Sequence, residues 1–297
     1  MPTNNVLVSV VVLAYNSSST IIETLNSVKE QTYGNIELII TDDGSLDTTI
    51  DICKQWLALN EKDFHDCKLI TTEVNTGLPA NCNRALHAST GEWIKFIAAD
   101  DSLKRECIEI NVKYISANTE VEILQTNAEV YIDIFDPSRF SCTLPNNFKE
   151  FFDLDEGRNQ YDFLKDKGYP LCTPSIFLKK CIIQQIGGFD ERFNFIEDMP
   201  LWLKLTKINI KIFYYPVSTV NYRSHDKSIA RDGKKYINAK FAKESLFLLR
   251  TLFQQNERSV RIKSIIRQLK CVIILDRVGF NNNSFFSKIL YYLSTKL

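Results

Sequence analysis

The first third of the chain alternates short apolar runs with amphipathic segments, and this alternation limits the folds available to it. Buried strands rich in Val and Ile are predicted at 6–14, 36–41, 68–72 and 93–98. Segments with helical spacing lie between them, at 21–28, 49–59 and 78–88. Strands that alternate with helices need right-handed crossovers, which produce a parallel sheet. We therefore expect an α/β fold with a mixed, mostly parallel central sheet.

The pattern becomes less regular after residue 121. One or two strands are predicted at 121–134, whereas 135–160 is polar, rich in aromatic residues and expected to be loop with short turns. Further elements follow, with strands at 175–178, 210–215 and 218–222 and helices at 180–186 and 199–207. From residue 229 onward the sequence predicts only helices.

The composition narrows the class of protein. The 297 residues are 44% hydrophobic, which is enough for a large core. Eight Cys occur without a C-x-x-C pair, which is typical of reduced, mostly buried thiols and of a cytoplasmic protein. The longest apolar run, 6–15, is too short to span a membrane and lacks a basic leader and a cleavage site. We expect a strand there and not a signal peptide.

The net charge of zero conceals an uneven distribution. Residues 229–297 carry 14 Lys and Arg against 4 Asp and Glu, whereas the remaining residues carry 22 against 32. Basic helices with apolar stripes suit an anionic membrane, so 258–297 is predicted to contact the inner face of the cytoplasmic membrane. Packing against the rest of the chain and a homodimer interface are the alternatives. Nucleic acid is not expected, because no binding motif accompanies the charge and the acidic part would repel phosphates.

Polar residues concentrate where the predicted strands end. The clusters are Ala14-Tyr15-Asn16, Thr41-Asp42-Asp43-Gly44-Ser45 and Ala99-Asp100-Asp101. Parallel strands bring their carboxyl ends to one edge, where ligands of open α/β sheets bind. Each cluster also has a purely structural alternative, since 43–45 could be a turn and Asp47 a helix cap. The loop after the first strand has no Gly, which excludes a dinucleotide-binding Rossmann turn and a Walker A loop there.

Four motifs occur in order, V-S-V-V-V-L-A-Y-N, I-E-L-I-I-T-D-D-G-S-L-D-T-T, N-T-G-L-P-A-N-C-N-R-A-L and G-E-W-I-K-F-I-A-A-D-D. Together they resemble the family 2 glycosyltransferases with the GT-A fold, of the bacterial O-antigen or capsule type. Weaker similarity continues to about residue 230, in G-G-F-D-E-R-F, E-D-M-P-L-W-L and Y-R-S-H-D-K-S. The resemblance implies a catalytic domain at 1–228, with a nucleotide-binding half (1–110) and an acceptor-binding half (111–228), followed by a basic helical extension (229–297).

The resemblance also implies roles for individual residues. A nucleotide-sugar site would be formed by Ala14, Tyr15, Asn16, Asp42, Asp43, Asn75, Gly77, Asn83, Ala99 and Asp100. In it, Asp43 would accept a hydrogen bond from the uracil ring, and Asn83 would lie along the ribose. Asp100 and His225 would bind a divalent cation, and Asp198 would be the general base.

Two departures from the family pattern affect this site. Ala98 stands where the family often has the first Asp of its D-x-D signature, and Cys82 stands where it often has Arg. The second Asp of the signature, Asp100, is present. A diphosphate leaving group needs a cation, and an oxygen-rich site suits Mg²⁺ or Mn²⁺, with the imidazole favouring Mn²⁺.

The resemblance implies transfer of a sugar to an acceptor hydroxyl with inversion at the anomeric carbon. Such a transfer needs a carboxylate that removes the proton of the acceptor hydroxyl. Asp198 is predicted as this base and Glu197 as a residue that orients hydroxyls, with helix capping as the alternative for Asp198. Residues predicted to border the sugar or acceptor are Asp101, Pro174, Ser175, Gly187, Gly188 and Phe189. The two glycines could instead be a helix stop, and Trp202 is expected in the core.

The sequence thus predicts an inverting, metal-dependent transferase that moves a sugar from a UDP-sugar to a saccharide acceptor linked to polyprenyl diphosphate, in bacterial surface polysaccharide synthesis. A non-catalytic sugar-nucleotide-binding protein is the first alternative, because of Ala98. A nucleotidyltransferase on a similar fold is the second, although it should carry a Gly-rich phosphate loop after the first strand.

Overall fold

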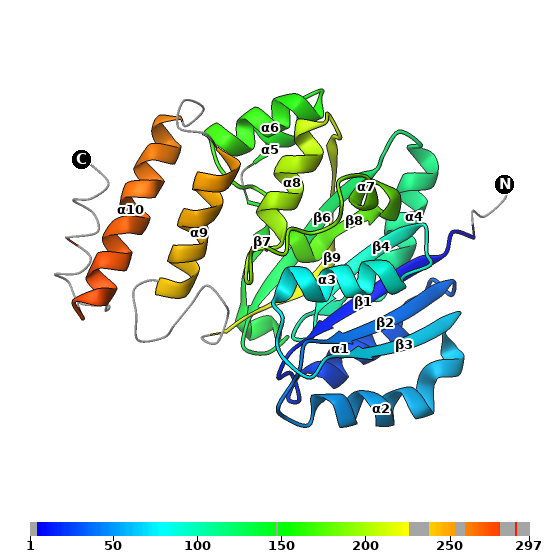
Figure 1. The fold of residues 1–297 in the computed structure, drawn as a ribbon. Helices are drawn as coiled ribbons and strands as arrows, with labels where there is room; N and C mark the ends of the chain where they lie inside the picture. The colour runs from blue at the N-terminus through cyan, green and yellow to red at the C-terminus, as the bar shows by residue number, and fades with distance from the viewer. Residues whose placement is uncertain (1–4, 147, 226–237, 254–258, 280–288, 290–297) are drawn as a thin grey trace.

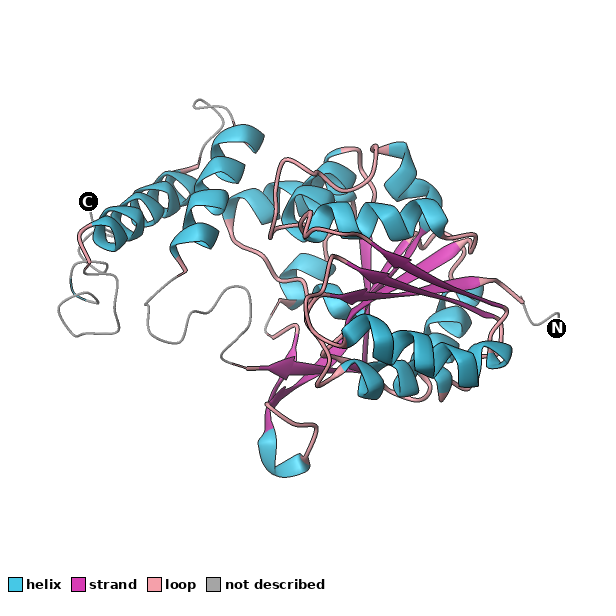
Figure 2. Ribbon diagram, turned by 60° about the horizontal axis from the view of Figure 1, so that its bottom comes forward, coloured by secondary structure: helices cyan, strands magenta, loops and turns pink. Residues whose placement is uncertain are grey.

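The computed structural model describes residues 5–146, 148–225, 238–253, 259–279 and 289. In this part of the chain a single nine-stranded sheet runs in the order β3-β2-β1-β4-β8-β6-β9-β5, with β7 paired to β6. The sheet is mixed and extends through both predicted halves of the catalytic domain. Helices cover it on both sides (Figures 1 and 2).

The first four strands form the parallel part of the sheet, as predicted. They are β1 (Val8–Ala14), β2 (Ile36–Asp42), β3 (Asp66–Thr71) and β4 (Trp93–Ala98). In register, Ala14 lies opposite Asp42 and Leu13 opposite Ala98. The carboxyl ends of β1, β2 and β4 therefore lie at one edge, where the polar clusters follow.

Alternate side chains of β1 enter two different cores because successive residues of a strand point to opposite faces. Val10 and Val12 pack with α1 (Ile21–Lys29), α2 (Thr49–Asn60) and α4 (Cys107–Ala117). Val11 packs in the other core, with α3 (Leu78–Ala88). The predicted helices at 21–28, 49–59 and 78–88 are confirmed.

The second half of the sheet differs in detail from the expectation. β6 (Ile123–Ile132) is one strand, and it pairs in parallel with β9 (Ile212–Ser224). β9 is a single strand where two were predicted, and its register to β6 shifts between Gln125 and Ala128. β8 (Ile176–Lys179) joins β4 to β6 by antiparallel pairing, and β5 (Ser102–Leu103) pairs with the far side of β9.

The expectation of loop at 135–160 is wrong. This stretch contains β7 (Phe140–Leu144), α5 (Lys149–Phe152) and the start of α6 (Gly157–Asp166). α6 buries Tyr161, Phe163 and Leu164 between charged neighbours, so its apolar stripe is short. Gly157 lies so close to the chain after α8 that an added Cβ would be 2.5 Å from the Ile210 carbonyl oxygen. Long-range packing, which local periodicity does not reveal, determines these elements.

The remaining helices are α7 (Lys180–Gln185), α8 (Asp198–Lys207), α9 (Ala239–Leu252) and α10 (Val260–Arg277). α10 lies along the outer side of α9 (Figure 1). Leu248 of α9 and Ile266 of α10 belong to the same core as Trp202, which is buried as expected. The apolar stripe of the basic extension thus packs against the rest of the chain, which is one of the alternatives given for this region. The sequence predicts only helices from residue 229 onward, and 229–237, 254–258, 280–288 and 290–297 of this region lie outside the described residues. None of the described helices is long and apolar enough to cross a membrane.

Candidate active site

The loops after β1 and β2 are joined by hydrogen bonds, as their shared sheet edge predicts. The Asp43 N–H donates to the Ala14 carbonyl oxygen (3.0 Å). The Asn16 N–H donates to Ser45 Oγ (2.7 Å), and Asn16 Oδ1 accepts from the Leu46 N–H (2.8 Å). Tyr15 is 44% exposed beside them. The two loops form one polar shelf, here called the nucleotide shelf (residues 14–16 and 42–46).

The carboxylate of Asp43 is buried and connects the nucleotide shelf to the loop before α3. It accepts hydrogen bonds from the Gly77 N–H (2.8 Å) and from both the N–H and the hydroxyl of Thr76. Arg84 forms an ion pair with it (2.5 Å). Sequence reasoning did not single out Arg84, although it lies two residues after Cys82, where the family often has Arg. The thiol of Cys82 is buried in the core. In α3 it is therefore Arg84 that places a guanidinium against Asp43.

The structural alternatives for the second cluster are also present. Asp42 accepts from the Ser45 N–H (2.8 Å) and closes a turn in which Gly44 has φ +76°. A Cβ on Gly44 would lie 2.7 Å from the Val74 carbonyl carbon, so only Gly fits. Asp47 accepts from the Thr49 N–H (3.0 Å) at the start of α2, as a helix cap would. The turn that Asp42 closes thus also shapes the nucleotide shelf.

Asn83 and Gly188 were predicted separately and lie in contact. Asn83 Oδ1 accepts from the Phe189 N–H (2.8 Å), and Nδ2 donates to the Phe189 carbonyl oxygen (3.0 Å). A Cβ on Gly188 would lie 2.6 Å from Asn83 Oδ1. In this structure the amide of Asn83 thus holds the 187–191 loop, and its contact with the ribose stays a prediction.

Gly187 and Gly188 end α7, as the helix-stop alternative requires. Both have positive φ, +80° and +82°. Their N–H groups donate to the carbonyl oxygens of Gln184 (3.0 Å) and Ile183 (2.9 Å). These bonds satisfy the last carbonyl groups of a helix, which otherwise have no partner.

Asp100 and His225 lie together, although they are far apart in sequence. His225 Nε2 is 2.9 Å from Asp100 Oδ2. Asp100 follows β4, and His225 follows the last residue of β9, so the two strands deliver the pair to one edge. Arg223 fixes this junction, because its Nε donates to the Asp100 carbonyl oxygen (2.7 Å) and its guanidinium also pairs with Glu23.

Asp100 and His225 provide some, but not all, of the ligand atoms that a divalent cation needs. A carboxylate oxygen and an imidazole nitrogen, each partly exposed, could bind Mn²⁺ or Mg²⁺ together with the diphosphate oxygens of a ligand. Within the described residues, no group of three or more His, Cys, Asp and Glu side chains could hold a metal. Ala98 accounts for the missing carboxylate. The pair therefore suits a cation that the diphosphate helps to bind.

Asp198 begins α8 and its carboxylate accepts hydrogen bonds from two side chains. Tyr169 Oη donates to Asp198 Oδ2 (2.7 Å), and Thr173 Oγ1 donates to the same oxygen (3.1 Å). The Met199 N–H donates to Asp198 Oδ1 (2.6 Å), but Glu197 is the N-cap of α8 and makes no side-chain capping bond, so the capping alternative for Asp198 is not observed. Burial and the neighbouring Asp198 raise the pKa of Glu197 well above its usual range. This shift favours the neutral carboxyl form of Glu197 more than in an exposed glutamate. Tyr169 was not predicted, because nothing in its local sequence marks it.

Three side chains predicted to border the acceptor are buried. Asp101 is 1% exposed, and its Oδ1 accepts from the Arg223 N–H (2.8 Å). Ser175 is fully buried and donates to the Thr126 carbonyl oxygen (2.8 Å). The Phe189 ring packs edge-on against Phe96, with 5.4 Å between ring centroids. In this structure these three side chains make contacts within the protein, and their contact with a sugar or acceptor stays a prediction, whereas Pro174 is partly exposed beside Thr173.

Comparison with known proteins agrees with this architecture. The profile of "Glycosyl transferase family 2" matches residues 9–167. The putative glycosyltransferase EpsE of Bacillus subtilis is 28% identical over 66% of this chain and 66% of its own length. The chain spans between 34% and 66% of the length of the first curated relatives it matches.

Solved structures share the fold at low sequence identity. Residues 1–349 of S. aureus TarS in complex with UDP-GlcNAc superpose with a TM-score of 0.61 at 16% identity, over 97% of this chain and 79% of the TarS 1–349 chain. The mannosyltransferase PcManGT from Pyrobaculum calidifontis, in complex with GDP-Man and Mn²⁺, gives 0.59 at 16% identity, over 99% and 75%. Because the family profile covers more than half of the chain, and the strand-end motifs assemble at one sheet edge, the chain belongs to glycosyl transferase family 2.

Proposed function

We propose that this protein is an inverting glycosyltransferase that transfers a sugar from a UDP-sugar to a saccharide acceptor. The observation that carries the proposal is the carboxylate of Asp198, which Tyr169 and Thr173 hold at the start of α8 beside Glu197. A fixed carboxylate of this kind is what removal of a hydroxyl proton requires. Membership of the family and the joined loops at the carboxyl ends of β1, β2 and β4 support it.

In this proposal the donor lies across the sheet edge. The uridine binds the nucleotide shelf and the 75–77 loop, with Asp43 and Arg84 beneath the base, and the diphosphate extends towards Asp100 and His225. A divalent cation on these two residues would neutralise the charge of the leaving diphosphate. The complexes of TarS with UDP-GlcNAc and of PcManGT with GDP-Man and Mn²⁺ support a nucleotide-sugar donor and a cation.

The transfer step balances without a further reactant. Asp198 takes the proton of the acceptor hydroxyl while that oxygen bonds to the anomeric carbon. The bond from this carbon to the diphosphate breaks on the opposite face, UDP leaves, and the configuration inverts. Glu197 orients a hydroxyl of donor or acceptor, and Tyr169 fixes the direction in which Asp198 points.

We infer that the acceptor is linked to polyprenyl diphosphate and that the product is a bacterial surface polysaccharide, such as an O-antigen or a capsule. The family resemblance and the exposed basic residues of α10 support this assignment. The enzyme would then work at the cytoplasmic face of the membrane.

The experiment that tests the proposal measures UDP release from a panel of UDP-sugars, including UDP-GlcNAc, with Mn²⁺ and polyprenyl-diphosphate-linked monosaccharides. We expect release with at least one donor, its loss in EDTA, and its loss in Asp198→Asn while UDP binding by calorimetry is retained. Full activity of Asp198→Asn would rule out the assigned base.

Ala98 favours one rival, a protein that binds sugar nucleotides without transferring them. Such a protein would bind UDP-sugars in the calorimeter and release no UDP with any donor. The same panel therefore separates the two functions.

A further inference from the structure

The segment from Phe193 to Asp198, here called the base segment, is held from two sides. On the nucleotide side, the Leu78 N–H donates to the Asn194 carbonyl oxygen (2.8 Å). Gly77 approaches so closely that a Cβ there would lie 3.1 Å from the Asn194 backbone. The loop that binds Asp43 and the segment that carries the proposed base are therefore directly bonded.

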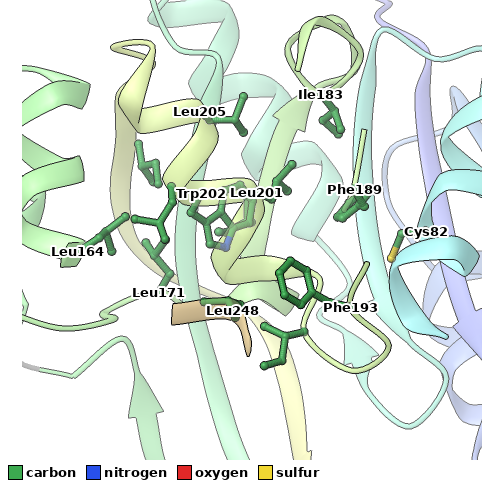
Figure 3. Packing of buried hydrophobic residues seen from close by; sticks show 14 of the residues in the cluster. Cys82, Leu164, Leu171, Ile183, Phe189, Phe193, Leu201, Trp202, Leu205 and Leu248 are labelled. Atoms are coloured by element: carbon green, nitrogen blue, oxygen red, sulfur yellow. The ribbon is translucent and has the colours of Figure 1, made fainter. Parts of the chain in front are cut away.

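On the other side, the base segment is held by α9 of the basic extension. Glu244 Oε1 accepts hydrogen bonds from the N–H groups of both Phe195 (2.6 Å) and Ile196 (3.0 Å). Phe247, one turn further along α9, contacts the ring of Phe193, with 5.6 Å between centroids. Leu248 lies in the core close to Phe193 and Trp202 (Figure 3).

These contacts restrict the backbone immediately before the proposed base. Hydrogen bonds that N–H groups donate to a charged carboxylate are stronger than those between neutral groups, and two of them fix the direction of a peptide segment. Ile196 is followed by Glu197 and Asp198, so a rotation of the Phe195 or Ile196 peptide would move the Asp198 carboxylate. The charge of Glu244 also helps to raise the pKa of Glu197, after burial and Asp198.

We propose that Glu244 is a positioning residue of the active site, through which α9 sets the orientation of the base segment. The basic extension is then part of the catalytic machinery and does not serve only as an attachment to a membrane. This inference rests on the proposed role of Asp198. Misplacement of a catalytic group by about 1 Å can cost up to about a hundredfold in rate, so loss of these two bonds has a measurable effect.

The kinetic test compares Glu244→Ala, Glu244→Gln and Lys243→Ala, using the UDP-sugar that the panel shows to be active. Glu244→Ala is expected to lower kcat by about tenfold and to change the donor KM by less than about twofold. Glu244→Gln keeps an acceptor oxygen and is expected to recover most of kcat. Lys243→Ala, exposed on the same helix, controls for the effect of Ala on α9 and should match the wild type.

Amide hydrogen exchange tests the contact without any activity. In Glu244→Ala the amides of Phe195 and Ile196 should exchange at least about tenfold faster, whereas the Leu78 amide should be unchanged. Unchanged exchange at both residues would overturn the contact. If Asp198→Asn is inactive and Glu244→Ala has wild-type kcat, the positioning role is overturned and the proposed function stands. If Asp198→Asn is active, the base assignment fails whatever Glu244 does.

Discussion

Asp100 and Asp101 are adjacent and identical in chemistry, yet they have different roles. Asp100 is partly exposed beside His225, whereas Asp101 points into the protein and accepts a hydrogen bond from the Arg223 N–H. Burial, together with the charge of Asp100, raises the pKa of Asp101 well above its usual range. A carboxyl group in that position stabilises the junction of β4 and β9 and is not available to a ligand.

Substitutions at these two positions should therefore affect different properties, ligand binding for Asp100 and stability for Asp101. Asp100→Asn should weaken Mn²⁺-dependent UDP binding by tenfold or more and leave stability nearly unchanged. Asp101→Ala leaves the Arg223 N–H without its partner and should lower the free energy of unfolding by about 1–3 kcal/mol. Isothermal calorimetry and urea denaturation measure the two quantities. Equal Mn²⁺-dependent UDP affinity in Asp100→Asn and wild type would contradict the metal assignment.

Tyr169 allows a second test of how Asp198 is oriented. Tyr169→Phe removes one hydroxyl that donates to Asp198 and preserves the ring, so kcat should fall by about tenfold, which corresponds to about 1.4 kcal/mol. The donor KM should not change. Tyr33→Phe is a matched control, because the Tyr33 hydroxyl also donates a hydrogen bond, to the Val6 carbonyl oxygen at the start of β1. A wild-type kcat in Tyr169→Phe would remove this residue from the mechanism.

At the beginning of β1 and β2, the parallel strands are joined by a buried ionic cluster. Glu37 is fully buried and accepts from Lys68 Nζ (2.6 Å), the Thr90 N–H (2.8 Å) and the Ser9 hydroxyl (2.5 Å). Burial by itself would raise the pKa of Glu37, but these donors outweigh it and lower the pKa to about 2. The cluster is far from the carboxyl ends of the strands and contributes to stability alone.

The lowered pKa of Glu37 predicts how stability depends on pH. Because the folded pKa lies below the ordinary value of 4.5, this stabilisation is present above about pH 4.5 and is lost as the pH falls towards 2. It is worth about 3 kcal/mol at neutral pH. Urea denaturation between pH 2 and 6 should show this loss in the wild type and a flatter profile in Glu37→Gln. Glu109→Gln, which removes an exposed ion pair with Lys113, is the control and should change little. Identical profiles for wild type and Glu37→Gln would contradict the role of this cluster.

Local patterns predicted those elements that make their own periodic core contacts. The strands β1, β2 and β4 are rich in apolar residues and buried along almost their whole length, and α3 repeats buried residues at helical spacing, so both were recognised. β7, α5 and α6 were missed because a few aromatic residues, such as Phe151 and Phe163, anchor them to distant parts of the chain. β9 was divided in two because Pro216 interrupts its pattern, although the strand continues past it.

The functional residues show the same difference. The strand-end residues belong to ordered motifs, so their common position was predictable. Arg84, Tyr169 and Glu244 act through contacts with residues that are far away in sequence, and no spacing marks such contacts. Asp101, Ser175 and Phe189 are buried, and sequence patterns do not state which way a side chain outside a helix or strand will point.

The basic extension has one face against the protein and another exposed. Arg261, Lys263, Arg267 and Lys270 of α10 are exposed, together with Ile274 and Val278 further along. Ile262 and Ile266 are buried against the remainder of the molecule. Among the described residues, these four basic side chains of α10 therefore form one outward surface.

This surface predicts binding to anionic lipid. The triple variant Lys263→Glu, Arg267→Glu, Lys270→Glu should bind phosphatidylglycerol vesicles at least a hundredfold more weakly, at about 1 kcal/mol for each basic residue lost. Its UDP affinity should be unchanged. Vesicle sedimentation measures the binding, and Lys54→Glu with Lys62→Glu, exposed on the opposite part of the molecule, is the control. Wild-type binding by the triple variant would assign the basic surface to another use, and sedimentation equilibrium would then test for a dimer.

The distribution of the site along the chain has a consequence for synthesis. Protein domains begin to fold from the amino terminus while translation continues. β1, β2, β3 and β4 are complete before residue 100, so the nucleotide shelf can form early. Asp100 has to wait for His225 to emerge from the ribosome, and the base segment has to wait longer, for Glu244. Under the proposed function, a nascent chain thus completes its nucleotide-binding loops well before its catalytic base is held in place, and an unfinished chain would not break the glycosyl bond of an activated sugar.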